Sequence, residues 1–219
     1  MSTWLFDLGN TRLKWAPLHA DGPGEAQAVA HDGSALPAGW ADALPSHCTL
    51  ACIASVAAPA LTTAVLEILA ARCERIARVR TVPALAGVRI AYAEPRRLGV
   101  DRFLALLAAH ARDARPWLVV GVGTALTIDL LAADGTHHGG RIAPSPTLMR
   151  EALSARAPQL PMAGGAYVEF ADDTLDALVS GCEGAALALV ERSLDAARAR
   201  FGARPALLLH GGGAEPLRA

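Results

Sequence analysis

The stretch TWLFDLGNTRLKWAP, residues 3–17, contains the pattern that decides the fold. Two apolar runs flank Gly9 and Asn10, residue types that favour tight turns. The pattern predicts a β-hairpin with strands over 3–8 and 12–17. A similar stretch, Gly121 to Ala125, follows roughly half a chain later between apolar flanks. This repetition favours two related halves, each of which opens with a hairpin.

The composition of the chain excludes several classes of protein. Of 219 residues, 53% are apolar and 19% are charged. This content can bury a large core and excludes an intrinsically disordered chain. The 20 basic and 21 acidic residues leave a net charge of −1. No excess of positive charge favours nucleic acid or an anionic membrane as a partner.

The sequence shows no targeting or membrane-spanning segment. The N-terminus has Asp7 and no basic region, unlike a signal peptide. The longest uncharged run, residues 43–66, contains two prolines and several polar residues, which argues against a membrane span. We therefore expect a cytoplasmic protein. No metal-binding pattern relates its four cysteines, so we expect reduced thiols. The cysteines are Cys48, Cys52, Cys73 and Cys182.

Strand and helix signals alternate along the chain, as in α/β proteins. We expect strands over 49–56, 137–143 and 206–209, and a longer apolar strand over 117–131 that carries Gly123 and Thr124. Helical spacing of apolar residues predicts helices over 60–79, 101–113, 147–156 and 174–200. Arg, Asp and Pro interrupt the apolar pattern near 113–116, which is the expected boundary between the halves.

Three loops of small residues are candidates for phosphate binding: 7–11, 121–125 and 211–213. Glycine allows close approach of the backbone to a ligand, and successive N–H groups form an anion cradle. Two such loops could hold a triphosphate together. None has the P-loop or dinucleotide-binding pattern. For any single loop, an ordinary hairpin turn is the simpler interpretation.

Two charged residues accompany the first loop. Asp7 could hold Mg²⁺ through water beside phosphates, or it could be a turn residue that caps the hairpin. Lys14 is the only lysine of the chain. It could contact a phosphate as a point charge, or it could be a solvated strand residue.

The segment from Tyr92 to Arg102 combines several functional residue types. Gly99 permits close approach of a ligand, and Asp101 places a base next to the carboxylate-binding guanidinium of Arg102. The alternative role for Asp101 is the N-cap of the helix over 102–113. The sequence leaves both roles open.

These segments together resemble the type III pantothenate kinases, within the superfamily of acetate and sugar kinases, chaperones and actin. Asp7 to Lys14 is similar to the first phosphate motif, and Gly123 to Asp129 to the second. Tyr92 to Arg102 is similar to the pantothenate segment, and Thr174 to Gly181 to a helix start that contacts pantothenate across the dimer. Three further segments also resemble family motifs, the last of them the adenosine loop: Ala54 to Pro59, Gly139 to Pro144 and Gly211 to Gly213.

The resemblance implies an α/β fold with two ribonuclease-H-like (actin-like ATPase) domains, over 1–114 and 115–219, and a cleft between them. By comparison with the family, we expect the second domain to be short at its C-terminus. The implied activity is ATP-dependent phosphorylation of pantothenate to 4′-phosphopantothenate, the first step of coenzyme A synthesis.

The resemblance also assigns roles to individual residues. Asp101 is the implied general base, and Asp7 positions Mg²⁺ through water. The implied ATP-binding residues are Asp7, Leu8, Gly9, Asn10, Thr11, Arg12, Leu13, Lys14, Gly123 and Thr124. The implied pantothenate-binding residues are Tyr92, Gly99, Val100, Asp101 and Arg102, with Thr174 supplied by the other subunit of a homodimer.

The resemblance further implies a monovalent cation, K⁺ or NH₄⁺, bound by an acid at the position of Gly121. Gly121 has no side-chain oxygen, so we expect a reduced or altered potassium dependence. Two other functions are weighed against the leading one. The chain could phosphorylate another small hydroxylated acid, or it could be a weak or inactive regulator that retains the kinase fold.

Overall fold

The computed structural model describes residues 2–217. Contacts between residues divide the chain into two compact units. The first contains the residues up to Val82 together with Arg96–Phe103. The second contains Pro83–Pro95 and the chain from Leu104 onward. The expected domain limits of 1–114 and 115–219 stay predictions.

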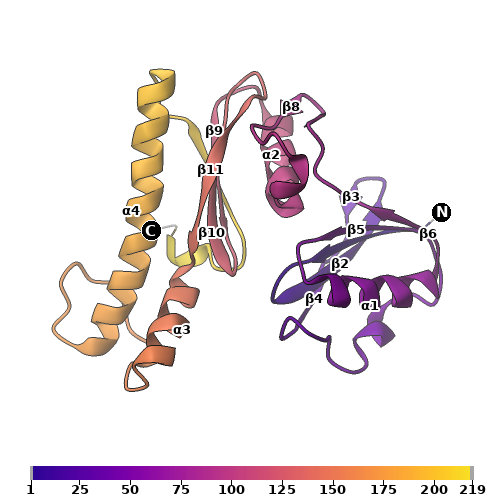
Figure 1. Cartoon of the computed structure of the whole chain (residues 1–219), viewed down its shortest axis with the longest axis horizontal. Helices are drawn as coiled ribbons and strands as arrows, with labels where there is room; N and C mark the ends of the chain where they lie inside the picture. Colours follow the sequence, from indigo (N-terminus) through magenta and orange to yellow (C-terminus); the bar gives the residue numbers. More distant parts are fainter. Residues whose placement is uncertain (1, 218–219) are drawn as a thin grey trace. The chain divides into compact units, whose positions relative to one another are not determined.

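The first unit is a mixed sheet with one helix packed on it (Figure 1). Strand β1 (Thr3–Leu8) pairs antiparallel with β2 (Arg12–His19) and parallel with β5 (Cys48–Ser55). Strands β3 (Gly22–Pro23) and β4 (Gln27–Ala30) pair with β2, and β6 (Cys73–Arg78) pairs with β5. The hairpin predicted from residues 3–17 is confirmed.

Helix α1 (Pro59–Ala70) supplies the apolar cover of this sheet. Pro59 fits its first position, where no intrahelical N–H bond is needed. Leu61, Val65 and Leu69 follow one another at i+4 and are buried against strand residues such as Phe6 and Ile53. A short 3₁₀ helix, η1 (Trp40–Ala43), adds the indole of Trp40 to the same core.

The second unit has its own sheet, in the order β11-β10-β9-β12. Strands β9 (Trp117–Val122), β10 (Ala125–Leu131) and β11 (His137–Pro144) form an antiparallel meander, and β12 (Ala206–His210) lies parallel to β9. All six residues of β9 are buried, as expected for a central strand. The expectation of one strand over 117–131 is therefore wrong, because the chain turns at Gly123 and Thr124 and forms two antiparallel strands.

Helix α4 (Thr174–Phe201) runs along one face of this sheet (Figure 1). Asp173 caps its N-terminus, and Gly202 ends it in the left-handed conformation. Helix α3 (Pro146–Arg156) packs against α4. Helix α2 (Val100–Arg112) begins in the first unit and continues in the second. Within residues 2–217, no helix combines the length and apolar character needed to cross a membrane.

The remaining elements are short. Strands β7 (Ala84–Leu85) and β8 (Val88–Arg89) form a small hairpin. The 3₁₀ helices η2 (Pro95–Arg97) and η3 (Glu215–Leu217) precede α2 and follow β12.

Both sheets share one connectivity. In each, the first strand is central, pairs antiparallel with the second, and pairs parallel with a strand that follows later. The expectation of an α/β fold is confirmed.

The predicted helix over 60–79 is wrong beyond residue 70. Helix α1 ends at Ala70, and residues 73–78 form the edge strand β6. The sequence gives no sign that the helix ends, because Cys73 and Ile76 follow Leu69 at the same spacing as the apolar residues of α1. In β6, Ile76 pairs with Ala51 of β5 instead.

The expectation of four reduced cysteines is also wrong. Cys48 and Cys73 form a disulfide, whereas Cys52 and Cys182 are free. The two bonded residues stand opposite each other on β5 and β6. Placing Cys73 in a helix concealed this pairing, because the strand register alone brings the two residues together.

The disulfide can be tested by titrating thiols in the denatured protein. Without reductant we expect two reactive thiols, from Cys52 and Cys182, and after reduction all four cysteines should react. Reduction should also lower the free energy of unfolding by about 3 kcal/mol, the typical effect of opening a loop of this size. Four reactive thiols without reductant would contradict the bond.

Candidate active site

The candidate site begins at the carboxyl ends of two parallel strands. Leu8 at the end of β1 is in register with Ser55 at the end of β5, and the Val56 N–H donates to the Leu8 carbonyl at 3.0 Å. In open α/β sheets, ligands bind at the carboxyl ends of the strands. The residues that follow β1 and β5 are therefore placed where a ligand would bind.

The first phosphate loop has the form of a tight hairpin turn. The Gly9 N–H donates to the Arg12 carbonyl at 2.9 Å, and Asn10 and Thr11 are exposed between them. The flanking side chains of Leu8 and Leu13 are fully buried. These leucines anchor the loop in the core, so only their backbone atoms can face a ligand.

Three electrostatic effects act on the pKa of the Asp7 carboxyl. Asp7 stands opposite Lys14 in the β1–β2 register. Desolvation by the surrounding protein raises the pKa of the Asp7 carboxyl, the positive charge of Lys14 opposes this effect, and the negative charge of Asp101 adds to it. The effect of the Asp101 charge on the pKa of Asp7 indicates that the two carboxylates lie near each other in the first unit.

The start of helix α2 holds Asp101 in place. Thr81 Oγ1 donates to the Leu98 carbonyl at 2.8 Å, and the Phe103 N–H donates to the Gly99 carbonyl at 3.1 Å. The helix begins at Val100, so Asp101 lies inside its first turn. The alternative role of Asp101 as N-cap is therefore wrong, and its exposed carboxylate remains available for chemistry.

Gly99 is required by the position of the Asp101 side chain. A Cβ atom at Gly99 would lie 2.5 Å from Asp101 Oδ1 and 3.8 Å from Val56 Cγ1. Any side chain there would displace the carboxylate. Arg102, the next residue, is only 6% exposed. The first unit thus brings together Asp7, Gly99 and Asp101.

The second unit holds the other two small-residue loops. Gly123 and Thr124 are exposed at the β9–β10 turn, which is closed by a Gly123 N–H bond to the Ala125 carbonyl at 3.0 Å. The Gly213 N–H donates to the Val122 carbonyl at 3.0 Å, which ties the loop after β12 to the end of β9. Gly211 has φ +102, and a Cβ atom there would lie 2.2 Å from the Val122 oxygen. The structure therefore places these two loops side by side.

Gly121 has no room for a side chain. A Cβ atom at this position would lie 2.7 Å from Thr127 Oγ1 and 3.0 Å from the imidazole of His210. His210 is the residue of β12 in register with Gly121. An acid at residue 121 would require His210 and Thr127 to move, so these neighbours explain why glycine occurs here.

Tyr92 rests on a buried pair that the sequence analysis did not identify. Its ring stacks on the imidazole of His137, with centroids 6.1 Å apart and an interplanar angle of 6°. His137 Nε2 lies 2.9 Å from Asp129 Oδ1, and the Ala91 N–H donates to His137 Nδ1 at 3.3 Å. Both members of the pair are buried, so they fix the backbone and the ring of the Tyr92 segment.

The sequence offered only a weak signal for this pair. Residues 137 and 138 attract attention as adjacent histidines, and neighbouring strand residues face opposite sides. In the structure, His138 contacts Phe201 instead. A histidine opposite an acid on a neighbouring strand could have been suspected only if the β10–β11 register had been known.

Thr174 and the metal prediction complete the set of candidate residues. Thr174 is the exposed first residue of α4, next to the N-cap Asp173. Among residues 2–217, no cluster of three or more His, Cys, Asp or Glu side chains could hold a metal ion. A divalent ion carried by nucleotide phosphates needs fewer protein ligands, and the single carboxylate of Asp7 fits that requirement.

Comparisons with known proteins agree with this geometry. The family model described as type III pantothenate kinase matches residues 4–196. The chain is 62% identical over 217 residues to the type III pantothenate kinase of Stenotrophomonas maltophilia strain K279a. It is 61% identical to the enzyme of the same name from Xanthomonas euvesicatoria pv. vesicatoria strain 85-10. Each alignment covers 99% of this chain and 88% of the relative.

Solved structures share the fold at low sequence identity. A conserved Baf family protein from Campylobacter jejuni superposes with a TM-score of 0.61 at 18% identity, over 98% of this chain and 85% of that one. The PilM–PilN type IV pilus biogenesis complex gives a TM-score of 0.54 at 14% identity, over 100% of this chain and 83% of that one. The family model and the curated relatives show that this chain belongs to the type III pantothenate kinase family.

Proposed function

We propose that this chain phosphorylates pantothenate with ATP, using Asp101 as the general base and Asp7 as the residue that orients the metal–nucleotide complex. Membership of the type III pantothenate kinase family supports the reaction, which yields 4′-phosphopantothenate for coenzyme A synthesis. The observation that carries the residue assignment is the place of the Asp101 carboxylate beside Gly99, close to Val56 at the end of β5, where its charge raises the pKa of Asp7.

The chemical step follows from the exposure of Asp101. Its carboxylate accepts the proton of the pantothenate hydroxyl, at a distance of about 2.6–3.2 Å in the complex. The hydroxyl oxygen attacks the γ-phosphorus of ATP in line, and the bond to the β-phosphate oxygen breaks to release ADP. The proton remains on Asp101 until solvent removes it.

Asp7 and the exposed loops form the proposed nucleotide site. Asp7 would hold Mg²⁺ through water, and a bound ion would supply positive charge beside the phosphates. The backbone of residues 8–13, the Lys14 ammonium and the turn at Gly123 and Thr124 would bind phosphate oxygens.

The proposed pantothenate site uses residues of complementary chemistry. The Arg102 guanidinium suits a carboxylate, which it can bind through two parallel hydrogen bonds. Gly99 and Val100 offer backbone atoms at the start of α2, and the ring of Tyr92 offers an apolar surface. Thr174 would add a hydroxyl from the second subunit.

No observation favours an inactive regulator. A protein without turnover would not need Asp7 and Asp101, and Gly99 provides the space that the Asp101 carboxylate occupies. A kinase for another hydroxylated acid is also not favoured, because the curated relatives are named as pantothenate kinases. A cytoplasmic location stays a prediction.

The general base is tested by Asp101→Asn. Loss of the base should lower kcat by about 10²–10⁴-fold, and the far-UV circular dichroism spectrum should not change. Formation of phosphopantothenate from ATP, Mg²⁺ and pantothenate can be followed by mass spectrometry, with Asp113→Asn as the control carboxylate. A variant that retains the kcat of the wild type would refute the assignment.

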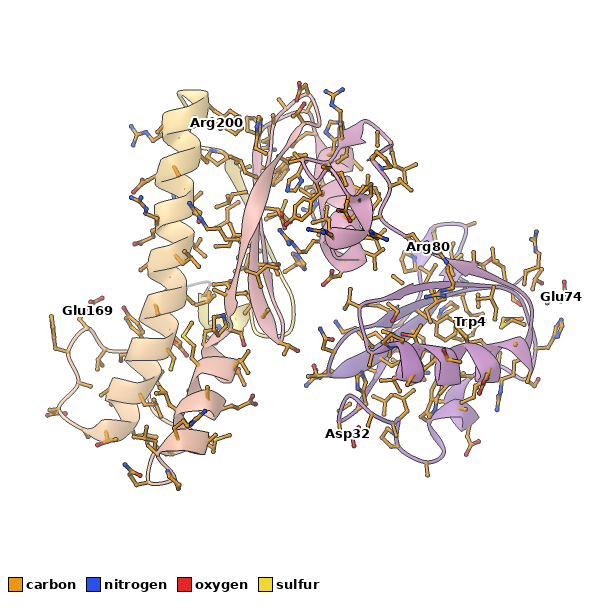
Figure 2. All side chains as sticks on the ribbon, viewed as in Figure 1. Trp4, Asp32, Glu74, Arg80, Glu169 and Arg200 are labelled. Atoms are coloured by element: carbon orange, nitrogen blue, oxygen red, sulfur yellow. A yellow bond between two sulfur atoms is a disulfide. The ribbon has the colours of Figure 1, made fainter. Side chains whose placement is uncertain are left out.

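A homodimer with a shared site belongs to the same proposal. The loop between α3 and α4, in which Glu169 is labelled in Figure 2, exposes apolar side chains close in sequence to Thr174, and Phe170 is 99% exposed. Exposed apolar side chains that gather into one patch are typical of an interface, and these lie within nine residues of one another in the sequence. The residues concerned are Met162, Tyr167, Val168 and Phe170.

Phe170→Glu should weaken this dimer, because it places a charge in an apolar contact. We expect the variant to elute as a monomer in size-exclusion chromatography with light scattering, and to lose affinity for pantothenate. Leu207→Glu, at another exposed apolar position, is the control and should remain dimeric. A wild-type protein that is monomeric and fully active would contradict the shared site.

The crowding at Gly121 supports a weak dependence on monovalent cations. His210 and Thr127 fill the space that an acid would need, so the side-chain ligand of the cation is absent. Replacing K⁺ and NH₄⁺ by a bulky organic cation at constant ionic strength should therefore leave kcat nearly unchanged. A strict requirement for K⁺ would show that other oxygen atoms build the cation site.

A further inference from the structure

We propose that His31 is a positioning residue that holds the first phosphate loop so that its backbone N–H groups face the nucleotide. The inference rests on the proposed function, since it deepens the role of the loop at residues 8–13. His31 belongs neither to the three small-residue loops nor to the segment from Tyr92 to Arg102. It directly follows β4, whose pairing with β2 places Ala30 opposite Arg12.

Two hydrogen bonds join His31 to the loop. The His31 main-chain N–H donates to the Thr11 carbonyl at 2.9 Å. The ring atom Nε2 lies 3.1 Å from the Gly9 carbonyl oxygen. The two carbonyl groups flank the tip of the hairpin, so His31 fixes the loop on both sides of Asn10.

The partners of the ring determine its proton distribution. A carbonyl oxygen can only accept, so Nε2 must carry a hydrogen. The other ring nitrogen, Nδ1, accepts from the Gly33 N–H at 3.0 Å and therefore carries none. His31 is thus a neutral imidazole with both nitrogens engaged, which orients its ring.

The geometry of the trans peptide bond determines where the N–H groups of Asn10 and Arg12 point. In a trans peptide the carbonyl and the following N–H point to opposite sides, and residues 2–217 contain no cis peptide bond. Because the Gly9 and Thr11 carbonyls point toward His31, the N–H groups of Asn10 and Arg12 point away from it. Backbone donors that point in one direction form a cradle for phosphate oxygens.

A hydrogen-bonded turn at residues 32–35 follows His31. Asp32 Oδ1 accepts from the Ser34 N–H at 2.8 Å, the Ala35 N–H at 3.0 Å and the Ser34 hydroxyl at 2.7 Å (Asp32 is labelled in Figure 2). These bonds, led by the one from Ala35, lower the pKa of Asp32 to about 2, so the carboxylate stays charged and the turn persists. Gly33 has φ +90, a conformation that favours glycine.

Two substitutions distinguish the bond from the His31 ring to Gly9 from the bond that the ring accepts from the Gly33 N–H. His31→Asn keeps an acceptor for the Gly33 N–H, in an Asx turn, but its side chain is too short to reach Gly9. His31→Gln places an amide N–H near the position of Nε2 and can restore the bond to the Gly9 carbonyl. If His31 only stabilised the fold, the affinity for MgATP would not fall in His31→Asn and recover in His31→Gln.

We expect His31→Asn to raise the KM for ATP and the Kd for MgATP about three- to tenfold, the usual effect of one lost hydrogen bond. The KM for pantothenate should stay constant. His31→Gln should recover most of the affinity for MgATP, measured by isothermal titration calorimetry. His47→Asn is the matched control, because the exposed imidazole of His47 contacts Glu74 on the surface. Melting temperatures measured in parallel identify any loss of folding.

The outcomes separate this inference from the proposed function. Equal MgATP affinity of the wild type and His31→Asn would overturn the role of His31, even in an active kinase. Failure of wild-type protein to bind MgATP would overturn it as well. A wild type that binds MgATP but forms no phosphopantothenate would overturn the proposed function alone, and the His31 variants would still decide the inference.

Discussion

The parallel pairing of β1 with β5 is the constraint on which the candidate site depends. The register that sets Leu8 against Ser55 ends both strands at the same edge of the sheet. The first phosphate loop follows β1 and Val56 follows β5, and the Val56 side chain would lie 3.8 Å from a Cβ atom at Gly99. The fully buried Leu8 and Leu13 hold the hairpin in the core, so their packing positions Asp7 for its interaction with Asp101.

The two sheets use one connectivity for different chemistry. Asp7 and Gly121 occupy equivalent places, each next to the end of a central strand. In the first unit this place carries a carboxylate, and the facing residue of the parallel strand is the small Ala54. In the second unit the carboxylate is absent and the facing residue is His210. The imidazole of His210 occupies the space next to Gly121, so the second unit has no carboxylate at the place where the first unit has Asp7.

The sequence predicted the features that depend on local pattern. The 3–17 hairpin, helix α2 and helix α4 each follow from apolar spacing and from turn or capping residues within a few positions. It failed where a long-range pairing decides the structure. Residues 73–78 keep a helical spacing, yet pairing with β5 makes them a strand, and that same pairing creates the Cys48–Cys73 disulfide.

The contacts that orient the site were missed for the same reason. His137 meets Asp129 across the β10–β11 pair, and His31 meets Gly9 because β4 lies beside β2. Neither histidine belongs to a motif that spacing alone would reveal. The residues proposed to bind ligands could be named from the sequence, whereas the residues proposed to position them required the strand registers.

The most direct measurement is the pKa of the Asp7 carboxyl, followed by carbon-detected nuclear magnetic resonance in the wild type and in Asp101→Asn. Desolvation by the surrounding protein and the charge of Asp101 both raise this pKa above its usual value, while Lys14 lowers it. Removing the charge at residue 101 should therefore lower the pKa of Asp7 without returning it fully to the usual value, because the desolvation remains. A pKa of Asp7 that is identical in the two proteins would show that the carboxylates do not share one site.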